Sequence, residues 1–344
     1  MTYIIGEIGQ NHNGSVDIAK TLVEIAARMI YEKVFKLELG SFDAVKLTKR
    51  DLQYELTKSK MNEPYNSPNS FGSTYGEHRN YLELNDEEHF EIYKCAKKNG
   101  LDFIETLCHQ NCLSILKLFY PDKLKVASRD LTNIPLLRAL SETKIPIIIS
   151  TGMSGKKDLD NALNVITKEH SDISILHCTS EYPTQPKNVN LNSIRYLRKN
   201  YTNYTIGFSD HTIGISAPIS AVAMGAEIIE KHITLDRGLK GSDQKGSLGI
   251  DGMERLVRDI RLYELYKGKE DLFLNDDLIM TKVKLERSIA TNKPMKKGDK
   301  ISITDIHLLS PGDGFKWINK SDIVGSILNC NISKDEIIYK NMLE

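Results

Sequence analysis

The chain has 344 residues, of which 40% are hydrophobic and 27% are charged, and its 46 basic and 46 acidic side chains give a formal net charge of zero. This is the composition of an ordinary globular protein of about two domains, and it excludes a wholly disordered chain, a collagen and a membrane bundle. A neutral chain is also a poor candidate for nonspecific nucleic-acid binding, so we expect no nucleic-acid partner. A local basic cleft for a small anion is compatible with this balance.

Cysteine usage and the N-terminus indicate a cytoplasmic protein. The five cysteines are odd in number and contain no Cys-x-x-Cys pair, which is typical of a reducing compartment. The N-terminus lacks a basic region followed by an apolar stretch, and no window reaches the roughly 18 apolar residues of a membrane span. We therefore expect a cytoplasmic location and no membrane partner.

Short β-rich apolar runs alternate with longer amphipathic stretches. The runs are Tyr3–Ile8, Asp43–Leu47, Asp102–Thr106, Leu124–Ala127, Pro146–Ser150, Ile173–His177, Thr205–Ser209 and Glu227–Ile233. Helical patterns between them include Asp17–Tyr31, Asp86–Asn99, Ile134–Glu142 and Ile215–Met224. Repeated βα units predict an α/β fold with a parallel sheet, and eight of them predict a closed (β/α)8 TIM barrel. An open doubly wound sheet is the alternative.

Two segments depart from this alternation. Between Leu47 and the helix near Asp86 lies a long polar stretch rich in Asn, Pro, Ser and Gly, which predicts a lid or a binding loop. After about Tyr266 the helical period stops at a polar break, and a weak repeat links the segments that begin at Ile289 and Ile327. We therefore expect a barrel domain over 1–267, a linker over 268–282 and a small β-rich module over 283–344.

Polar side chains stand at the predicted strand ends, where the active site of such a barrel lies. Lys46 and Lys125 supply two positive charges inside an apolar frame. Hydroxyl donors come from Ser128, Ser150 and Ser209, with Ser180 just beyond the sixth strand. This set suits a phosphate or a phospho-carboxylate.

Two histidines end neighbouring predicted strands. His211 and His232 could reach one divalent ion and leave its other positions open to water or substrate. They could equally be structural histidines bonded to loop backbone, and their spacing does not choose between the two.

Several ordered blocks resemble the sialic acid synthase family. The opening segment Gly6–Gly14 (GEIGQNHNG) is similar to that family's AEIGxNHNG motif. Successive similar blocks are Asp43–Lys46, Lys125–Asn133, Ser150–Met153, His177–Pro183, Gly207–Thr212, Glu230–Asp236 and Gly241–Leu248. The tail resembles the antifreeze-like (SAF) domain through Arg287–Ile289, Lys297–Asp299 and Pro311–Gly314. The resemblance covers essentially the whole chain.

The resemblance implies condensation of phosphoenolpyruvate with an N-acylated hexosamine, N-acetylmannosamine or a close relative, to a nine-carbon 2-keto sugar acid and phosphate. Phosphoenolpyruvate would be held by Lys46, Lys125, Ser128, Ser150 and Ser209. His211 and His232 would hold Mn²⁺ or Mg²⁺, and Asp130 and Tyr182 would line the pocket, where we also place Ser180. Glu7 is the candidate general base, with Asp243 second. The resemblance also implies a homodimer in which the SAF module of one chain covers the barrel mouth of the other.

Three positions depart from the family pattern. Thr48 stands where glutamine is common, Gln244 where histidine is common, and Ser310 where an arginine usually reaches the partner's sugar pocket. These departures leave open a 2,4-diacetamido hexose of the legionaminic or pseudaminic type, or a phosphorylated aldose, as the acceptor. The alternative outside enzymes is a noncatalytic sugar-binding protein. The segment Arg28–Phe42 is also unusual before the second strand.

Overall fold

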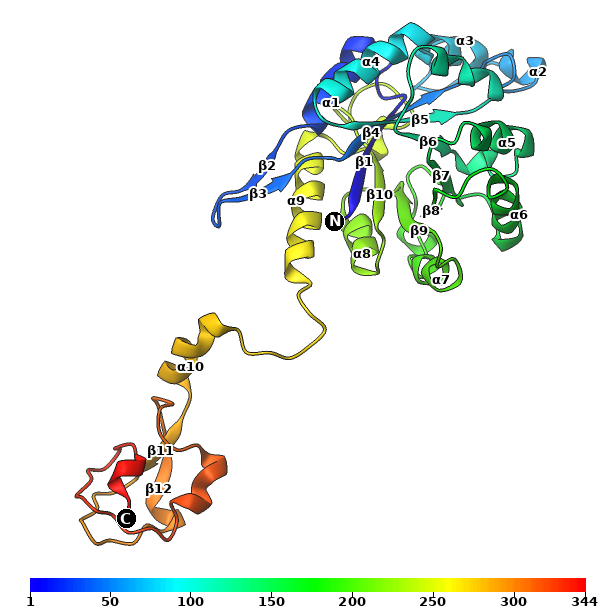
Figure 1. Ribbon diagram of the computed structural model, residues 1–344. Coiled ribbons are helices and arrows are strands. Elements are labelled where there is room, and N and C mark those ends of the chain that lie inside the picture. Colours follow the sequence, from blue (N-terminus) through cyan, green and yellow to red (C-terminus); the bar gives the residue numbers. More distant parts are fainter. The chain divides into compact units, whose positions relative to one another are not determined.

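A computed structural model describes the whole chain, Met1–Glu344. It divides into two compact units, Met1–Gly268 and Lys269–Glu344 (Figure 1). None of the helices has the length and apolar character needed to cross a membrane.

The first unit is a closed barrel of eight parallel strands. The strands are β1 (Tyr3–Gly9), β4 (Ala44–Lys49), β5 (Asp102–Leu107), β6 (Lys123–Val126), β7 (Ile147–Ser150), β8 (Ile173–Cys178), β9 (Thr205–Asp210) and β10 (Ile228–His232). Each strand pairs with the next along the chain, and β1 pairs with both β4 and β10, which closes the ring. The TIM-barrel prediction is therefore confirmed, and the open sheet is excluded.

Helices surround the strands (Figure 1). They are α1 (Val16–Ala26), α4 (Asp86–Lys98), α5 (Ile134–Glu142), α6 (Lys156–Ile166), α7 (Asn192–Asn200), α8 (Ser216–Ala223) and α9 (Ile250–Tyr266). A 3₁₀ helix, Gln110–Lys117, takes the place of an α-helix after β5. The main hydrophobic core lies between the outward face of the strands and these helices.

The interior of the barrel is layered, because alternate residues of each strand point inward. One interior layer is apolar and forms a buried cluster of Ile5, Ala44, Ile104, Ile148, Leu176 and Ile228. Two positions further along the same strands stand Glu7, Lys46, Thr106, Ser150, Cys178 and Glu230. The strand period thus places a polar layer on an apolar floor, toward the carboxyl ends of the strands.

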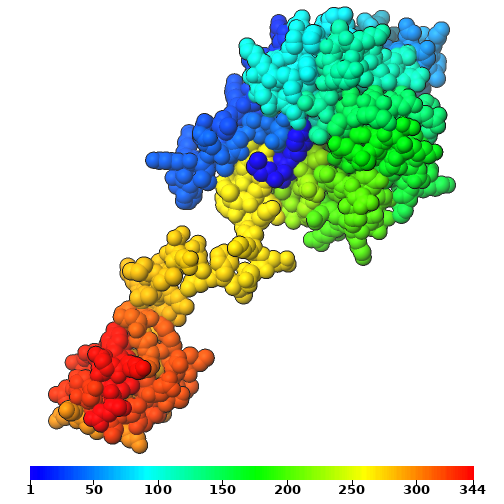
Figure 2. Space-filling view, viewed as in Figure 1, coloured from blue at the N-terminus to red at the C-terminus, as the bar shows by residue number.

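The unusual segment before β4 is a projecting hairpin. The first helix ends at Ala26, so the prediction that it reaches Tyr31 is wrong, and Tyr31 lies in β2 (Ile30–Glu32), paired with β3 (Leu37–Gly40). The Glu32 carboxylate accepts hydrogen bonds from the backbone N–H groups of Val34 and Phe35, at 3.1 and 2.6 Å. These bonds stabilise the turn locally. The hairpin, coloured blue in Figure 2, projects from the barrel.

The long connection after β4 is partly helical. It contains α2 (Lys58–Met61) and α3 (Tyr75–Leu82). Helix α3 begins with a capping box, in which Thr74 accepts from the Glu77 N–H and Glu77 accepts from the Thr74 N–H. The connection predicted as a lid or a binding loop therefore contains two short helices.

The second unit has its own small core. It contains α10 (Ile279–Leu285), β11 (Ser288–Thr291) and β12 (Ile306–Leu309), and α10 begins inside the expected linker. The two copies of the weak repeat pair with each other through bridges of Ala290 with Ile337, Met295 with Ile332 and Lys300 with Ile327. The core residues are Ile289, Met295, Ile301, Ile306, Ile323, Leu328, Ile332 and Ile338.

Candidate active site

A cavity of about 470 Å³ opens at the carboxyl ends of the barrel strands. The structure brings these predicted site residues together on its wall: Glu7, Lys46, Lys125, Ser128, Ser150, Ser180, Tyr182, Ser209, His211, His232 and Asp243. Asp130 is not on the wall, and its carboxylate instead accepts a hydrogen bond from Arg129, at 3.3 Å. Side chains from every strand end thus converge as the barrel geometry predicts.

One side of the cavity is a cradle of cation and hydroxyl groups. The Lys125 ammonium donates to Ser150 Oγ at 2.6 Å and to the Val126 carbonyl at 3.1 Å. Burial lowers the pKa of Lys125, because water no longer stabilises its charge. Ser128 Oγ accepts from the Gly152 N–H at 3.0 Å. A Cβ at Gly152 would lie 2.4 Å from Ser180 Oγ, so only glycine allows these hydroxyls to converge.

A second cluster joins Lys46 to two buried glutamates. The Lys46 ammonium pairs with Glu7 and lies 3.7 Å from Glu230, and it also donates to Thr106 Oγ1 at 3.0 Å. Burial raises the pKa of Glu7 to about 7, although Lys46 opposes the shift. Burial alone would raise the pKa of Glu230 as well, but Lys125 and Lys46 lower it to about 2. The two carboxyl groups therefore differ, and Glu7 is the one that can exchange a proton near neutral pH.

The two histidines lie side by side, with ring centroids 5.5 Å apart. His211 Nδ1 lies 2.9 Å from the Thr179 carbonyl oxygen, which can only accept, so Nδ1 carries the hydrogen and Nε2 keeps its lone pair. His232 Nδ1 is buried without a hydrogen-bond partner, and burial lowers the pKa of His232, which favours the neutral ring. Two such imidazoles fit as ligands of one divalent ion.

No group of three or more His, Cys, Asp or Glu side chains is arranged to hold a metal ion. An ion at His211 and His232 would therefore take its other ligands from water or substrate. Tyr182 packs against His211, with ring centroids 4.0 Å apart, and so borders the same place.

The three departures from the family pattern lie in different surroundings. Thr48 lines the cavity. Gln244 is buried beside it, where its amide oxygen accepts from Thr234 and its amide nitrogen donates to the Asn11 carbonyl at 3.4 Å. Ser310 belongs to the second unit, and its hydroxyl donates to the Leu285 carbonyl at 2.9 Å.

Sequence reasoning missed several groups on the cavity wall. Thr106 and Glu230 could have been found, because each lies two positions after an inward apolar residue of its strand. Arg50, Arg79 and Arg129 also line the cavity. Arg129 lies in the family-like block Lys125–Asn133, where no role was assigned to it, and no motif marks Arg50 or Arg79. Arg79 belongs to α3, whose place beside the barrel mouth depends on tertiary packing.

A closed (β/α)8 barrel with cationic, hydroxyl and imidazole groups gathered at its carboxyl rim has the architecture of a TIM-barrel enzyme. The model of the NeuB family matches residues 38–271, and that of the SAF domain matches residues 286–344. The chain therefore belongs to the NeuB family of sialic acid-type synthases, and its second unit is a SAF domain.

Similar proteins support this assignment. The N,N'-diacetyllegionaminic acid synthase of Legionella pneumophila is 35% identical over 339 residues, covering 96% of this chain and 91% of that protein. The human N-acetylneuraminate-9-phosphate synthase is 30% identical over 344 residues, covering 99% and 92%. The crystal structure of the N-acetylneuraminic acid synthetase from Leptospira borgpetersenii in complex with citrate aligns with a TM-score of 0.67 at 28% identity, covering 81% of this chain and 90% of that one. The resemblance stated from the motifs is confirmed.

Proposed function

We propose that this protein condenses phosphoenolpyruvate with an N-acylated hexosamine to give a nine-carbon 2-keto sugar acid and inorganic phosphate. The observation that carries the proposal is the cradle around Lys125. The hydrogen-bond partners of this buried ammonium are an uncharged hydroxyl and a carbonyl, which favours a bound anion, and the hydroxyls of Ser128, Ser180 and Ser209 lie on the same wall. Phosphoenolpyruvate brings two anionic groups, and Lys46 supplies the second cation.

The residues divide the chemistry between them. The cradle of Lys125, Ser128, Ser150, Ser180 and Ser209 would hold the phosphate. Carbon 3 of phosphoenolpyruvate forms a bond to the acceptor's aldehyde carbon, whose oxygen takes up the electron pair and a proton. Water then adds to carbon 2, and the adduct releases phosphate as its C–O bond breaks. The lysines offset the phosphate and carboxylate charge throughout these steps.

Glu7 is the proposed base that removes the proton from the attacking water. A pKa of about 7 leaves a substantial fraction of its carboxylate unprotonated at neutral pH, ready to take a proton. Asp243 lines the same cavity and accepts a hydrogen bond from Ser242 at 2.8 Å, and it is the second candidate.

His211 and His232 would hold Mn²⁺ or Mg²⁺. Such an ion would act as a Lewis acid that makes the acceptor's carbonyl carbon more electrophilic. The free nitrogen of each ring supports this assignment over a purely structural one. Tyr182 would border the acceptor beside these rings.

The acceptor is N-acetylmannosamine or a close relative, with a 2,4-diacetamido hexose as the second candidate. The names of the relatives support both, because one is a 9-phosphate synthase of N-acetylneuraminate and another makes N,N'-diacetyllegionaminic acid. We further propose a cytoplasmic homodimer in which the SAF domain of one chain completes the partner's site.

The test is phosphate release from phosphoenolpyruvate in the presence of each sugar in turn, with the 2-keto acid product measured separately. Product should form with at least one N-acylated hexosamine and not without sugar. Glu7→Gln keeps the shape of the side chain and removes the base, so it should abolish product formation. Binding of a sugar with no phosphate release under any condition would favour the noncatalytic sugar-binding protein.

A further inference from the structure

Arg79 is a cation on the cavity wall whose partners are neutral. Its Nε donates to the Tyr75 hydroxyl at 2.6 Å, and its Nη1 donates to Gln10 Oε1. The guanidinium carbon also lies 4.9 Å from the centroid of the Tyr75 ring. These contacts orient the guanidinium without neutralising it, and the second terminal nitrogen is left for a ligand.

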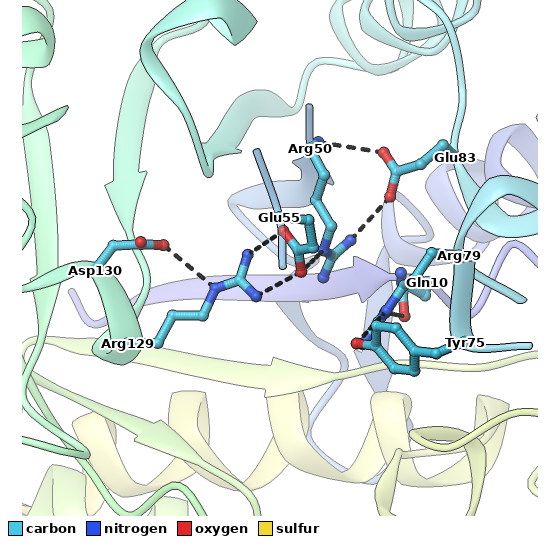
Figure 3. Close-up of polar contacts among 8 residues, drawn as sticks. All are labelled: Gln10, Arg50, Glu55, Tyr75, Arg79, Glu83, Arg129 and Asp130. Carbon is cyan, nitrogen blue, oxygen red and sulfur yellow. Dashed lines mark hydrogen bonds and ion pairs between the residues drawn. The ribbon is translucent and has the colours of Figure 1, made fainter. Parts of the chain in front are cut away.

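The other two arginines of the wall are held by carboxylates (Figure 3). Arg129 donates to both oxygens of Glu55, and Arg50 donates to Glu83 at 3.2 Å. These pairs join the two ends of the connection between β4 and α4 to the barrel rim. Figure 3 shows Arg79 with Gln10 and Tyr75, outside this chain of ion pairs. The paired arginines therefore fix the segment that carries Arg79.

One buried donor beside Arg79 lacks an acceptor. Gln10 accepts from Arg79 through its oxygen, which directs its Nε2 elsewhere, and that nitrogen is buried without a partner. A buried donor left unpaired is costly, so this part of the cavity is built to meet acceptor oxygens.

Binding of phosphoenolpyruvate does not account for Arg79 and the unpaired Gln10 nitrogen. Its phosphate and carboxylate have Lys125, Lys46 and the hydroxyls of the polar layer. A neutral sugar could accept a hydrogen bond from Gln10 Nε2, but it would leave the Arg79 guanidinium without an ion-pair partner. An anionic group would pair with the Arg79 guanidinium and also offer an acceptor oxygen to Gln10. Hydrogen bonds between ionised partners are about twice as strong as neutral ones, so this ligand is favoured over a neutral one.

We propose that Arg79, positioned by Gln10 and Tyr75, binds an anionic group that the acceptor sugar carries away from its aldehyde carbon. The group is a phosphate or a carboxylate, since both present acceptor oxygens to a guanidinium. This inference rests on the proposed function and narrows its acceptor to a charged N-acylated hexose.

The experiment compares three acceptors at saturating phosphoenolpyruvate: N-acetylmannosamine, its 6-phosphate and the corresponding 6-carboxylate. The 2-keto acid product is the readout. The wild-type kcat/KM should be at least about tenfold higher with one anionic sugar than with the neutral one, which also distinguishes phosphate from carboxylate. Arg79→Gln should lower kcat/KM for that anionic sugar by about ten- to a hundred-fold, the effect of one hydrogen bond to a charged group.

Three controls separate this role from a structural one. In Arg79→Gln, the KM for phosphoenolpyruvate should stay within about twofold, and kcat/KM should fall much less for the neutral sugar than for the anionic one. Arg79→Lys should recover part of the preference, and Arg195→Gln, on the exposed face of α7, should change nothing. Thermal unfolding checks that the variants remain folded.

The possible results separate the role of Arg79 from the condensation itself. Equal use of charged and neutral sugars by the wild type, or equal losses for both in Arg79→Gln, would overturn the role of Arg79 and leave the condensation standing. Preference of the wild type for a neutral 2,4-diacetamido hexose would also overturn the role of Arg79 and leave the condensation standing. Absence of product from every sugar would overturn the proposed function and this inference with it.

Discussion

Arg129 and Glu55 form a two-pronged ion pair across 74 positions of sequence, with Nη1 to Oε1 at 2.7 Å and Nη2 to Oε2 at 3.0 Å. The Glu55 side chain is 3% exposed, whereas that of Arg129 is 36% exposed. Arg129 follows β6 and Glu55 belongs to the connection after β4. The pair therefore ties this connection to the rim of the barrel.

Arg129→Gln should loosen that attachment. The loss of charge-assisted hydrogen bonds to a buried carboxylate should lower the free energy of unfolding by about 1.5–3 kcal/mol. Limited proteolysis should then cut faster within residues 50–83, and urea unfolding gives the stability. Arg258→Gln is the control, because Arg258 pairs with its exposed neighbour Asp259. An unchanged cleavage pattern would show that the pair does not anchor the connection.

Lys125 and Lys46 should respond in opposite directions when each is replaced by methionine. A lysine whose folded pKa lies below its unfolded value opposes folding at any pH where it is charged in the unfolded chain. Lys125→Met removes that cost, so it should keep or raise stability while abolishing phosphate release. Lys46→Met leaves Glu7 without its ion-pair partner and removes one of the two cations near Glu230, so it should destabilise by about 3–5 kcal/mol.

Thermal and urea unfolding measure this contrast, with phosphate release as the second readout. Loss of stability in Lys125→Met would mean that the surroundings of the Lys125 ammonium offset the cost of burying its charge more fully than its two hydrogen bonds indicate. Full activity of Lys125→Met would remove the basis of the proposed phosphate cradle.

The barrel and its polar layer could be predicted from the sequence, because both follow from a period of two. Ile5 and Glu7, or Ile148 and Ser150, occupy successive inward positions, so strand assignment alone places them. The hairpin Ile30–Gly40 could not be predicted, since its strands are short and its turn depends on Glu32. The place of Arg79 in the site could not be predicted either, because only the packing of α3 brings it to Gln10.

Metal dependence follows from the free nitrogens of His211 and His232. Chelation should abolish phosphate release, and Mn²⁺ should restore it. Calorimetric titration of the stripped protein with Mn²⁺ should show one site per chain, lost in His211→Ala and His232→Ala but kept in His170→Ala, which lies in the loop after α6. Retained folding in the variants is checked by thermal unfolding. Full activity of the metal-free protein would contradict the assignment.

The SAF domain should be required for activity but not for folding of the barrel. The barrel has its own core, so a chain truncated after Tyr266 should still unfold cooperatively. If the domain completes a partner's site, truncation should abolish product formation, and the full chain should sediment as a dimer. An active monomer at assay concentration, or full activity after truncation, would refute the exchange.

Ser310 bears on the neutral part of the acceptor. The family resemblance places an arginine here, whose fork of donors can bond a sugar carbonyl in a way that serine cannot reproduce. The Ser310 hydroxyl is instead engaged with the Leu285 carbonyl. Loss of a charged donor costs about 1.5–3 kcal/mol, or roughly ten- to a hundred-fold in affinity, so N-acetylmannosamine should show a high KM while phosphoenolpyruvate saturates normally.

Ser310→Arg should then lower the KM for N-acetylmannosamine and leave that for phosphoenolpyruvate unchanged. Steady-state kinetics of both substrates measure the two effects, and Ser321→Arg, at another exposed position of the SAF domain, controls for added charge. The improvement should appear in Arg79→Gln as well, because the two arginines would contact different groups of the sugar. Tight use of N-acetylmannosamine by the wild type, or no effect of Ser310→Arg, would show that this departure does not set the acceptor.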